Sequence, residues 1–266
     1  MPNTPIAVAW IEACKRLCVP YVAVAGGTSS STLADRLADT GASLLVTSDS
    51  LLATAVAAAA ALLEPPILLL AEPAHGEAAL PAGCLSAAAL LARAQAVVYE
   101  SADPEGLTDT QLVASVWRHA APRPVEASWP LFVLYTSGST GTPKGIVHTH
   151  GGYQVGLCAT AHLVLALRPE SDVLCVVATA GWITGQSYMI CAALLSMVPS
   201  VLIDGSATSP PDRIAAVIAR CQVTVFKAGS TFLRMLMATP DSERRCATLP
   251  KCPCANGAAR RSALEA

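Results

Sequence analysis

Short apolar runs alternate with longer amphipathic stretches along most of this chain. The runs have the length and the branched and aromatic content of buried strands, and the stretches between them have helical spacing. The predicted strands are Tyr21–Ala25, Leu44–Thr47, Ile67–Leu70, Ala96–Tyr99, Leu131–Tyr135, Val173–Val177, Ser200–Ile203 and Val223–Phe226. The predicted helices include Ala7–Leu17, Leu51–Leu63, Gly152–Leu167, Gly185–Met197, Pro211–Arg220 and Thr231–Met237. This order predicts an α/β fold in which parallel-sheet layers carry helices on both faces.

Glycine and proline mark the boundaries of several of these elements. The first predicted strand ends at Gly26-Gly27, and a helix with Leu33 and Leu37 on its apolar face follows, capped by one of the residues Ser29 to Thr32. Surface connections are expected at Pro65-Pro66, Glu72–Leu85 and Ala120–Ser128, where the pattern breaks.

A loop rich in glycine and hydroxyl residues follows the predicted strand Leu131–Tyr135. From Tyr135 to Gly145 it reads YTSGSTGTPKG. Gly138 and Gly141 let the backbone turn its N–H groups toward one centre, and the serines and threonines add hydroxyl donors. Lys144 adds a positive charge, and a second short strand is expected over residues 145–150. The pattern predicts a phosphate-binding loop between two strands.

Two other interpretations of this loop are weaker. A Walker A loop that starts at Gly138 would place its lysine at Lys144, but Pro143 stands where the second glycine belongs and Gly145 where Ser or Thr holds magnesium. A P-loop also opens a helix, whereas a strand is expected here. A flexible Ser/Gly turn without chemistry is common for this composition. The buried strand before the loop and the single lysine near its end favour a binding loop instead.

The loop resembles the phosphate-binding signature of the adenylate-forming (AMP-binding) superfamily, which includes acyl-CoA synthetases, peptide-synthetase adenylation domains and luciferases. Residues 148–153, HTHGGY, and 181–188, GWITGQSY, resemble stretches of short-chain acyl-CoA synthetases of the acetyl-CoA synthetase type. The resemblance runs from about Pro5 to about Ala238. It implies that the chain is part of the large N-terminal domain of an adenylate-forming enzyme.

The resemblance implies an ATP-dependent acid–thiol ligase with ATP, Mg2+ and CoA as reactants and cofactor. A carboxylate attacks the α-phosphorus of ATP to give an acyl-adenylate and pyrophosphate, and CoA then displaces AMP. Lys144 and Thr140 are the implied catalytic residues, because donors must take up charge on the leaving pyrophosphate. The implied phosphate-binding residues are Thr136, Ser137, Gly138, Ser139, Thr140, Gly141, Thr142 and Lys144.

Trp182, Ile183 and Thr184 border the acyl pocket and the CoA thiol in the resembling enzymes. A bulky Ile183 implies a short acid, such as acetate, propionate or 3-hydroxypropionate. Gly26 and Gly27, with Thr184, are the implied contacts of CoA. The residues alone favour a core aromatic at Trp182 and a plain tight turn at Gly26-Gly27, and only the resemblance favours site roles. Two positions depart from the acetyl enzymes, which usually have His at Gln186 and Asn near Ala207.

Composition limits the partners that this chain can have. Apolar residues make up 53% of the sequence and charged residues 14%, with a net charge of −2. We therefore expect neither a nucleic acid nor an anionic membrane as a partner. The apolar stretches Leu51–Leu63 and Met189–Ile203 end or break at prolines, short of the roughly 20 residues of a spanning helix. With no secretory pattern in Met1–Pro5, the cytoplasm is expected, with an organelle as the alternative.

The chain has ten cysteines, and no metal site is assigned to them. Seven are dispersed in apolar surroundings and are predicted to lie in the core: Cys14, Cys18, Cys84, Cys158, Cys175, Cys191 and Cys221. Cys246, Cys252 and Cys254 leave a thiolate site open but lack paired C-x-x-C spacing. His148 and His150 lack an obvious third ligand, and the resemblance places them beside the phosphate loop.

The ends of the chain set the predicted domain limits. Residues 1–240 are predicted to form a partial AMP-binding domain, and residues 241–266 a divergent tail that is not native to the fold. The adenine and ribose motifs and the C-terminal domain that the family carries are not recognisable. Two functions stay open. The first is a synthetase that needs a complementing chain or a missing C-terminal domain, and the second is a catalytically inactive fragment that keeps a phosphate-binding loop.

Overall fold

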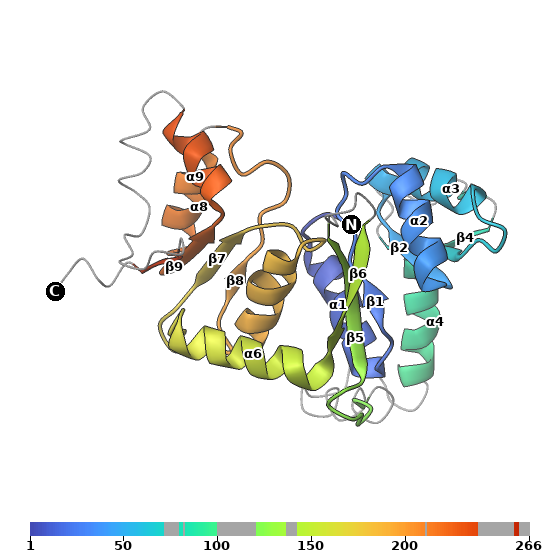
Figure 1. The fold of residues 1–266 in the computed structure, drawn as a ribbon, viewed down its shortest axis with the longest axis horizontal. Helices are drawn as coiled ribbons and strands as arrows, with labels where there is room; N and C mark the ends of the chain where they lie inside the picture. The colour runs from blue at the N-terminus through green and yellow to red at the C-terminus, as the bar shows by residue number, and fades with distance from the viewer. Residues whose placement is uncertain are drawn as a thin grey trace. The chain divides into compact units, whose positions relative to one another are not determined.

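The computed structural model describes residues 1–71, 80–81, 83–99, 121–136, 143–210, 212–238 and 258–260 (Figure 1). The chain forms two compact units. The first comprises Met1, Glu12–Val19 and Gly26–Pro124, and the second comprises Pro2–Ile11, Pro20–Ala25 and Val125–Ala266. Helix α1, Pro5–Leu17, therefore contributes residues to both units.

The first unit contains a parallel sheet of short strands. Strands β2 (Leu44–Thr47), β3 (Ile67–Leu70) and β4 (Cys84–Ser86) are hydrogen-bonded in that order. The helical segments η1 (Asp49–Leu51) and α3 (Leu52–Ala60) connect β2 to β3, and α4 (Ala87–Tyr99) follows β4. Ala55 and Ala59 of α3 share a core cluster with Leu68 and Leu70 of β3. Their small side chains let the helix pack closely on the apolar strand.

Helix α2 (Ser30–Thr40) of the first unit is capped at both ends. The Ser29 side chain accepts a hydrogen bond from the backbone N–H of Thr32. At the other end, Gly41 takes a φ of 60°, and its N–H donates to Ala38 O. Leu33 and Leu37 are buried. These contacts confirm the predicted amphipathic helix and identify Ser29 as its cap.

The larger sheet of the second unit has helices on both faces. Strands β8 (Ser200–Val201), β7 (Leu174–Val177) and β9 (Val225–Ala228) are parallel neighbours, and β10 (Ala258–Arg260) pairs with β9 antiparallel. Leu174 and Val176 enter a core cluster with residues of α6 (His150–Leu163) and of the π-helix η2 (Gly185–Ala192). Cys175 points to the opposite core cluster, with residues of α8 (Arg213–Arg220) and α9 (Ser230–Met237), drawn in orange and red in Figure 1. This alternation confirms a sheet covered on both sides.

A smaller sheet of the same unit carries the glycine-rich loop. Its order is β1 (Tyr21–Val22), β5 (Pro130–Thr136) and β6 (Lys144–Thr149), in which β1 is parallel to β5 and β6 is antiparallel to it. Phe132 at the middle of β5 is fully buried. The prediction of a buried strand before the loop and a second strand after it is confirmed.

Several of the predicted elements need correction, including these four. Ala96–Tyr99 is not a strand but the last part of α4, because the alanine-rich run before it continues as a helix through Val97 and Val98. Glu72–Leu85 is not all connection, since Cys84 and Leu85 belong to β4. The helix predicted over Leu51–Leu63 ends at Ala60. The helix predicted over Gly185–Met197 consists of the π-helix η2 and a short α7 (Ala193–Leu195).

The cysteine prediction is only partly right. Cys84, Cys175 and Cys191 are buried, whereas Cys14 and Cys18 are half-buried and Cys158 and Cys221 are exposed. Cys158 and Cys221 lie on the outer side of α6 and just beyond α8, where an apolar sequence neighbourhood does not ensure burial. Cys246, Cys252 and Cys254 lie outside the described residues. Within the described ranges, no helix is long and apolar enough to cross a bilayer, and no group of three or more potential metal ligands occurs.

Candidate functional site

The hairpin of β5 and β6 positions the predicted phosphate loop. Tyr135 pairs with Gly145 and Thr136 with Lys144, so the loop leaves one strand and returns directly into the next. A Cβ at Gly145 would lie 3.0 Å from Val133 Cγ1 and 3.3 Å from Tyr135 Cζ. Glycine at this position therefore lets the strand pack beneath the Tyr135 ring. The strand–loop–strand arrangement excludes a P-loop, whose loop opens a helix.

Thr136 and Lys144 form the last pair of the hairpin. Because directly opposed residues of an antiparallel pair project to the same face, both side chains stand on one face at the base of the loop. Both residues are exposed, and within the described ranges no carboxylate forms an ion pair with Lys144. The predicted residues Ser137, Gly138, Ser139, Thr140, Gly141 and Thr142 lie outside the described residues. The structure thus brings two of the predicted phosphate-binding residues together and leaves six untested.

The hairpin packs through an aromatic cluster centred on Phe132 of β5. The Phe132 ring stacks on His148 at a centroid distance of 4.5 Å and meets Tyr153 edge-on at 4.8 Å. Tyr21 of β1 lies 5.5 Å from the same ring. The Tyr153 hydroxyl shares a hydrogen bond of 2.9 Å with Ser187 of η2. His148 is therefore a packing partner of Phe132.

The segment Trp182–Thr184 joins strand β7 to helix η2. Trp182 is 57% exposed and Ile183 36% exposed, and Thr184 is half-buried. Its turn is closed by two backbone hydrogen bonds, from Trp182 N–H to Thr179 O (3.1 Å) and from Gln186 N–H to Trp182 O (3.0 Å). The alternative that Trp182 is a core aromatic is wrong, because the described residues leave more than half of its surface uncovered. An exposed indole next to a branched side chain can line a binding surface for a small apolar group.

The sequence profile of the family described as AMP-binding enzyme matches residues 1–265. The chain belongs to the AMP-binding enzyme family. The resemblance indicated by the glycine-rich loop is confirmed, and the hairpin described above is the part of this family member that carries that loop.

Relatives named acetyl-coenzyme A synthetase are similar to this member of the family. The protein of Mycobacterium bovis (strain ATCC BAA-935 / AF2122/97) is 33% identical over 247 residues, covering 91% of this chain and 36% of the relative. The protein of Marinomonas sp. (strain MWYL1) is 35% identical over 254 residues, covering 92% and 36%. The chain thus spans about a third of the length of these curated relatives.

A solved structure has the same fold over most of this chain. A crystal structure of an acyl-CoA synthetase from Brucella canis matches with a TM-score of 0.65 and 23% sequence identity, covering 92% of this chain and 39% of that chain. The match confirms the predicted fold class, an α/β arrangement of parallel sheets and helices.

The predicted CoA contacts are divided between the two units. Gly26 and Gly27 lie in the first unit, are exposed, and precede the capped helix α2. Thr184 lies in the second unit. Ala207, which the resemblance places near a CoA-binding position, packs against the core cluster of α8 and α9. The role of these residues toward CoA remains a prediction.

The contacts of two polar residues in the second unit were not predicted from the sequence. Lys227 of β9 lies over the Tyr188 ring, with Nζ 4.5 Å from the ring centroid, and burial lowers the pKa of its ammonium group. The sequence feature that could have indicated this contact is a single lysine within an apolar strand. Asn3 forms hydrogen bonds with three backbone groups, two of them just before Trp182–Thr184, and nothing in its local sequence indicates this role.

A pocket of about 450 Å³ opens between β6 and α6, bordered by His148, Tyr153 and Thr160. It lies at the end of β6 away from Lys144, since the strand runs from Lys144 to Thr149. The pocket therefore does not include the predicted phosphate-binding residues Thr136 and Lys144.

Burial of His148 predicts a pH-dependent stability. Burial lowers the pKa of its imidazole below the ordinary 6.5, so the folded chain binds this proton less readily than the unfolded chain does. Stability linked to His148 is complete above about pH 6.5 and is lost as the pH falls toward the folded pKa. We expect Tm to fall less between pH 7.5 and pH 5 in His148→Phe than in the wild type, as followed by circular dichroism. An equal fall in Tm over this pH range in both proteins would show that His148 does not contribute to the pH dependence of stability.

Proposed function

We propose that this chain supplies the phosphate-binding hairpin and the acid-binding segment of an ATP-dependent acyl-CoA synthetase, an acid–thiol ligase. One observation carries the proposal: Thr136 and Lys144 form the pair that closes YTSGSTGTPKG in a chain of the AMP-binding enzyme family. The relatives named acetyl-coenzyme A synthetase support the choice of ligase over other members of the family.

In the first half-reaction, an oxygen of the acid's carboxylate would attack the α-phosphorus of ATP, and the bond to the bridging oxygen of the pyrophosphate would break. Lys144 and the hydroxyls of Thr136 and Thr140 would donate to the oxygens of the β- and γ-phosphates. These donors lower the barrier because they stabilise charge that grows on the leaving group. Mg2+ would enter bound to ATP and would neutralise phosphate charge there, and no described residue is assigned as its ligand.

Trp182, Ile183 and Thr184, called the acyl segment below, would border the acid and the incoming thiol of CoA. The branched side chain of Ile183 shortens a pocket more than alanine or glycine would, which favours acetate, propionate or 3-hydroxypropionate over longer acids. In the second half-reaction the thiol would displace AMP from the acyl-adenylate to give the thioester. We assign Thr184, Gly26 and Gly27 to this step on the resemblance alone.

A second candidate is a binding module without turnover. The observation that favours it is that the chain spans about a third of the relatives named above. The synthetase candidate, by contrast, requires a complementing chain or a further C-terminal domain for catalysis. We also propose that residues 1–240 form the AMP-binding part and that the tail from residue 241 onward is foreign to it, although β10 within that tail pairs with β9.

A pyrophosphate-release assay tests whether this polypeptide is a complete catalyst by itself. With ATP, Mg2+ and acetate, propionate or 3-hydroxypropionate, we expect the 266-residue polypeptide to release no more pyrophosphate than its Lys144→Ala variant. The physical reason is that the phosphate loop and the acid-binding segment do not by themselves hold the adenine and the ribose of ATP. Robust turnover that depends on Lys144 would show that the polypeptide is a complete catalyst and would rule out the binding module.

A further inference from the structure

The peptide groups around Ala180 are held from two sides. On one side, Ala180 N–H donates to Asn3 Oδ1 at 3.0 Å, while Asn3 Nδ2 donates to Ala178 O at 2.8 Å and to Ile203 O at 2.9 Å. On the other side, Gln186 Nε2 donates to Ala180 O. Asn3 thereby fastens the backbone just beyond β7 to the backbone just beyond β8. Both polar groups of the Ala180 residue are satisfied by side chains rather than by water.

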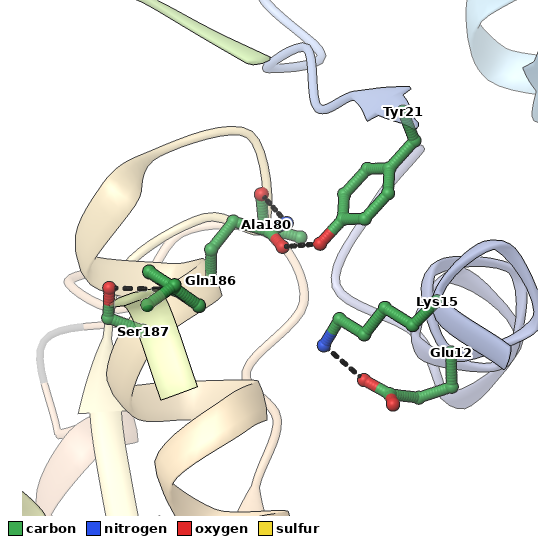
Figure 2. Close-up of polar contacts among 7 residues, drawn as sticks. Glu12, Lys15, Tyr21, Ala180, Gln186 and Ser187 are labelled. Atoms are coloured by element: carbon green, nitrogen blue, oxygen red, sulfur yellow. Dashed lines mark hydrogen bonds and ion pairs between the residues drawn. The ribbon is translucent and has the colours of Figure 1, made fainter. Parts of the chain in front are cut away.

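Gln186 is itself fixed by a third side chain. It is completely buried, and its Oε1 accepts a hydrogen bond of 2.9 Å from the Tyr21 hydroxyl. Figure 2 shows Tyr21 directed at the end of Gln186, and Gln186 directed at Ala180. Tyr21 lies on β1, where it pairs with Phe132 of the hairpin strand β5. Strand β1 is thus connected through two side-chain hydrogen bonds in series to Gln186 and Ala180, which flank Trp182–Thr184 on either side.

Two glycines on either side of Trp182–Thr184 allow the backbone there to approach other backbone atoms closely. A Cβ at Gly181 would lie 2.2 Å from Ala25 N, and a Cβ at Gly185 would lie 1.9 Å from Thr179 O. The chain is therefore immobilised on both sides of Trp182, Ile183 and Thr184. Only these three residues lie between the fixed points, and two of them are the exposed residues of the segment.

We propose that Asn3, Tyr21 and Gln186 are positioning residues that hold Trp182, Ile183 and Thr184 in a single arrangement. That this arrangement receives the acid rests on the proposed function, whereas the bracing itself does not. A buried amide whose two ends are both bonded specifies one conformation, because any other leaves a buried donor or acceptor without a partner. Loss of the Tyr21 hydroxyl should therefore loosen the segment locally before it unfolds the chain.

Fluorine NMR of the full chain labelled with 5-fluorotryptophan tests the bracing. The Trp182 signal is assigned by its absence in Trp182→Phe. We expect one sharp Trp182 line in the wild type and a broadened or split line in Tyr21→Phe and Asn3→Ala. Amide hydrogen exchange of residues 180–186 should accelerate at least fivefold in the same two variants. Tyr21→Phe is decisive if Asn3→Ala does not fold, because it removes only one oxygen.

Thr224→Val is the matched control. It also removes a half-buried hydroxyl of the second unit, one that donates to Asp172 Oδ1 and accepts from Val173 N–H. It should leave the Trp182 line and the exchange of residues 180–186 unchanged. An unaltered line and unaltered exchange in folded Tyr21→Phe would overturn the proposal, as would an equal effect of Thr224→Val. Neither measurement contains nucleotide or acid, so failure of the proposed function would leave these results intact, and failure of the bracing would leave the pyrophosphate assay unaffected.

Discussion

Gly181→Ala is expected to destabilise this chain by about 3 kcal/mol or more, or to prevent folding of the second unit. The added methyl would lie 2.2 Å from Ala25 N, 2.5 Å from Ala25 Cα and 2.6 Å from Val24 C. All three atoms belong to the backbone just beyond β1, so no side-chain rotation relieves the overlap. The midpoint of urea unfolding measures the loss.

Gly156→Ala provides the matched comparison for this substitution. Gly156 lies within helix α6, and a Cβ there would meet nothing within 4 Å. Alanine should raise the stability by up to about 1 kcal/mol, because it has the higher helix propensity. A midpoint for Gly181→Ala close to that of the wild type would mean that the segment after β7 does not lie against the end of β1.

The hairpin is the part of the site that the sequence predicted best. Leu131–Tyr135 is continuously apolar and ends in glycine and hydroxyl residues, and the structure shows β5 entering the loop at that boundary. From the sequence, Gly145 is a mismatch to the Walker A pattern and the expected start of the second strand. The structure adds its reason, which is the contact with the Tyr135 ring. The local sequence pattern was sufficient to predict the hairpin, because its two strands and the loop between them are adjacent in the sequence.

The contacts that shape the acyl segment could not be predicted in this way. Asn3 and Ala180 are separated by 177 positions and Tyr21 and Gln186 by 165, so no local period connects them. The sequence predicts Tyr21 only as an aromatic residue of a strand, and its contact with Gln186 is seen only in the tertiary structure. The strand predicted over Ala96–Tyr99 was wrong for the opposite reason. Its local signal, Val97, Val98 and Tyr99 with high strand propensity, was outweighed by the alanine-rich helix that these residues continue.

Lys144→Ala is expected to weaken MgATP binding by about ten- to a hundredfold. A hydrogen bond to a charged group contributes about 1.5–3 kcal/mol, and the Lys144 ammonium is the one charge that the sequence places in the phosphate loop. Lys15→Ala should leave binding unchanged, because Lys15 lies on α1 in an ion pair with Glu12. The affinity of the wild type should also fall with rising ionic strength, as expected for an exposed charge.

Calorimetric titration of MgATP into the full chain, its Lys144→Ala variant and its Lys15→Ala variant tests the central claim most directly. Saturable binding in the wild type and in Lys15→Ala, with at least a tenfold loss in Lys144→Ala, is the result that a phosphate-binding β5–β6 hairpin predicts. Binding of equal strength in all three proteins, or no binding by the folded wild-type chain, would contradict it.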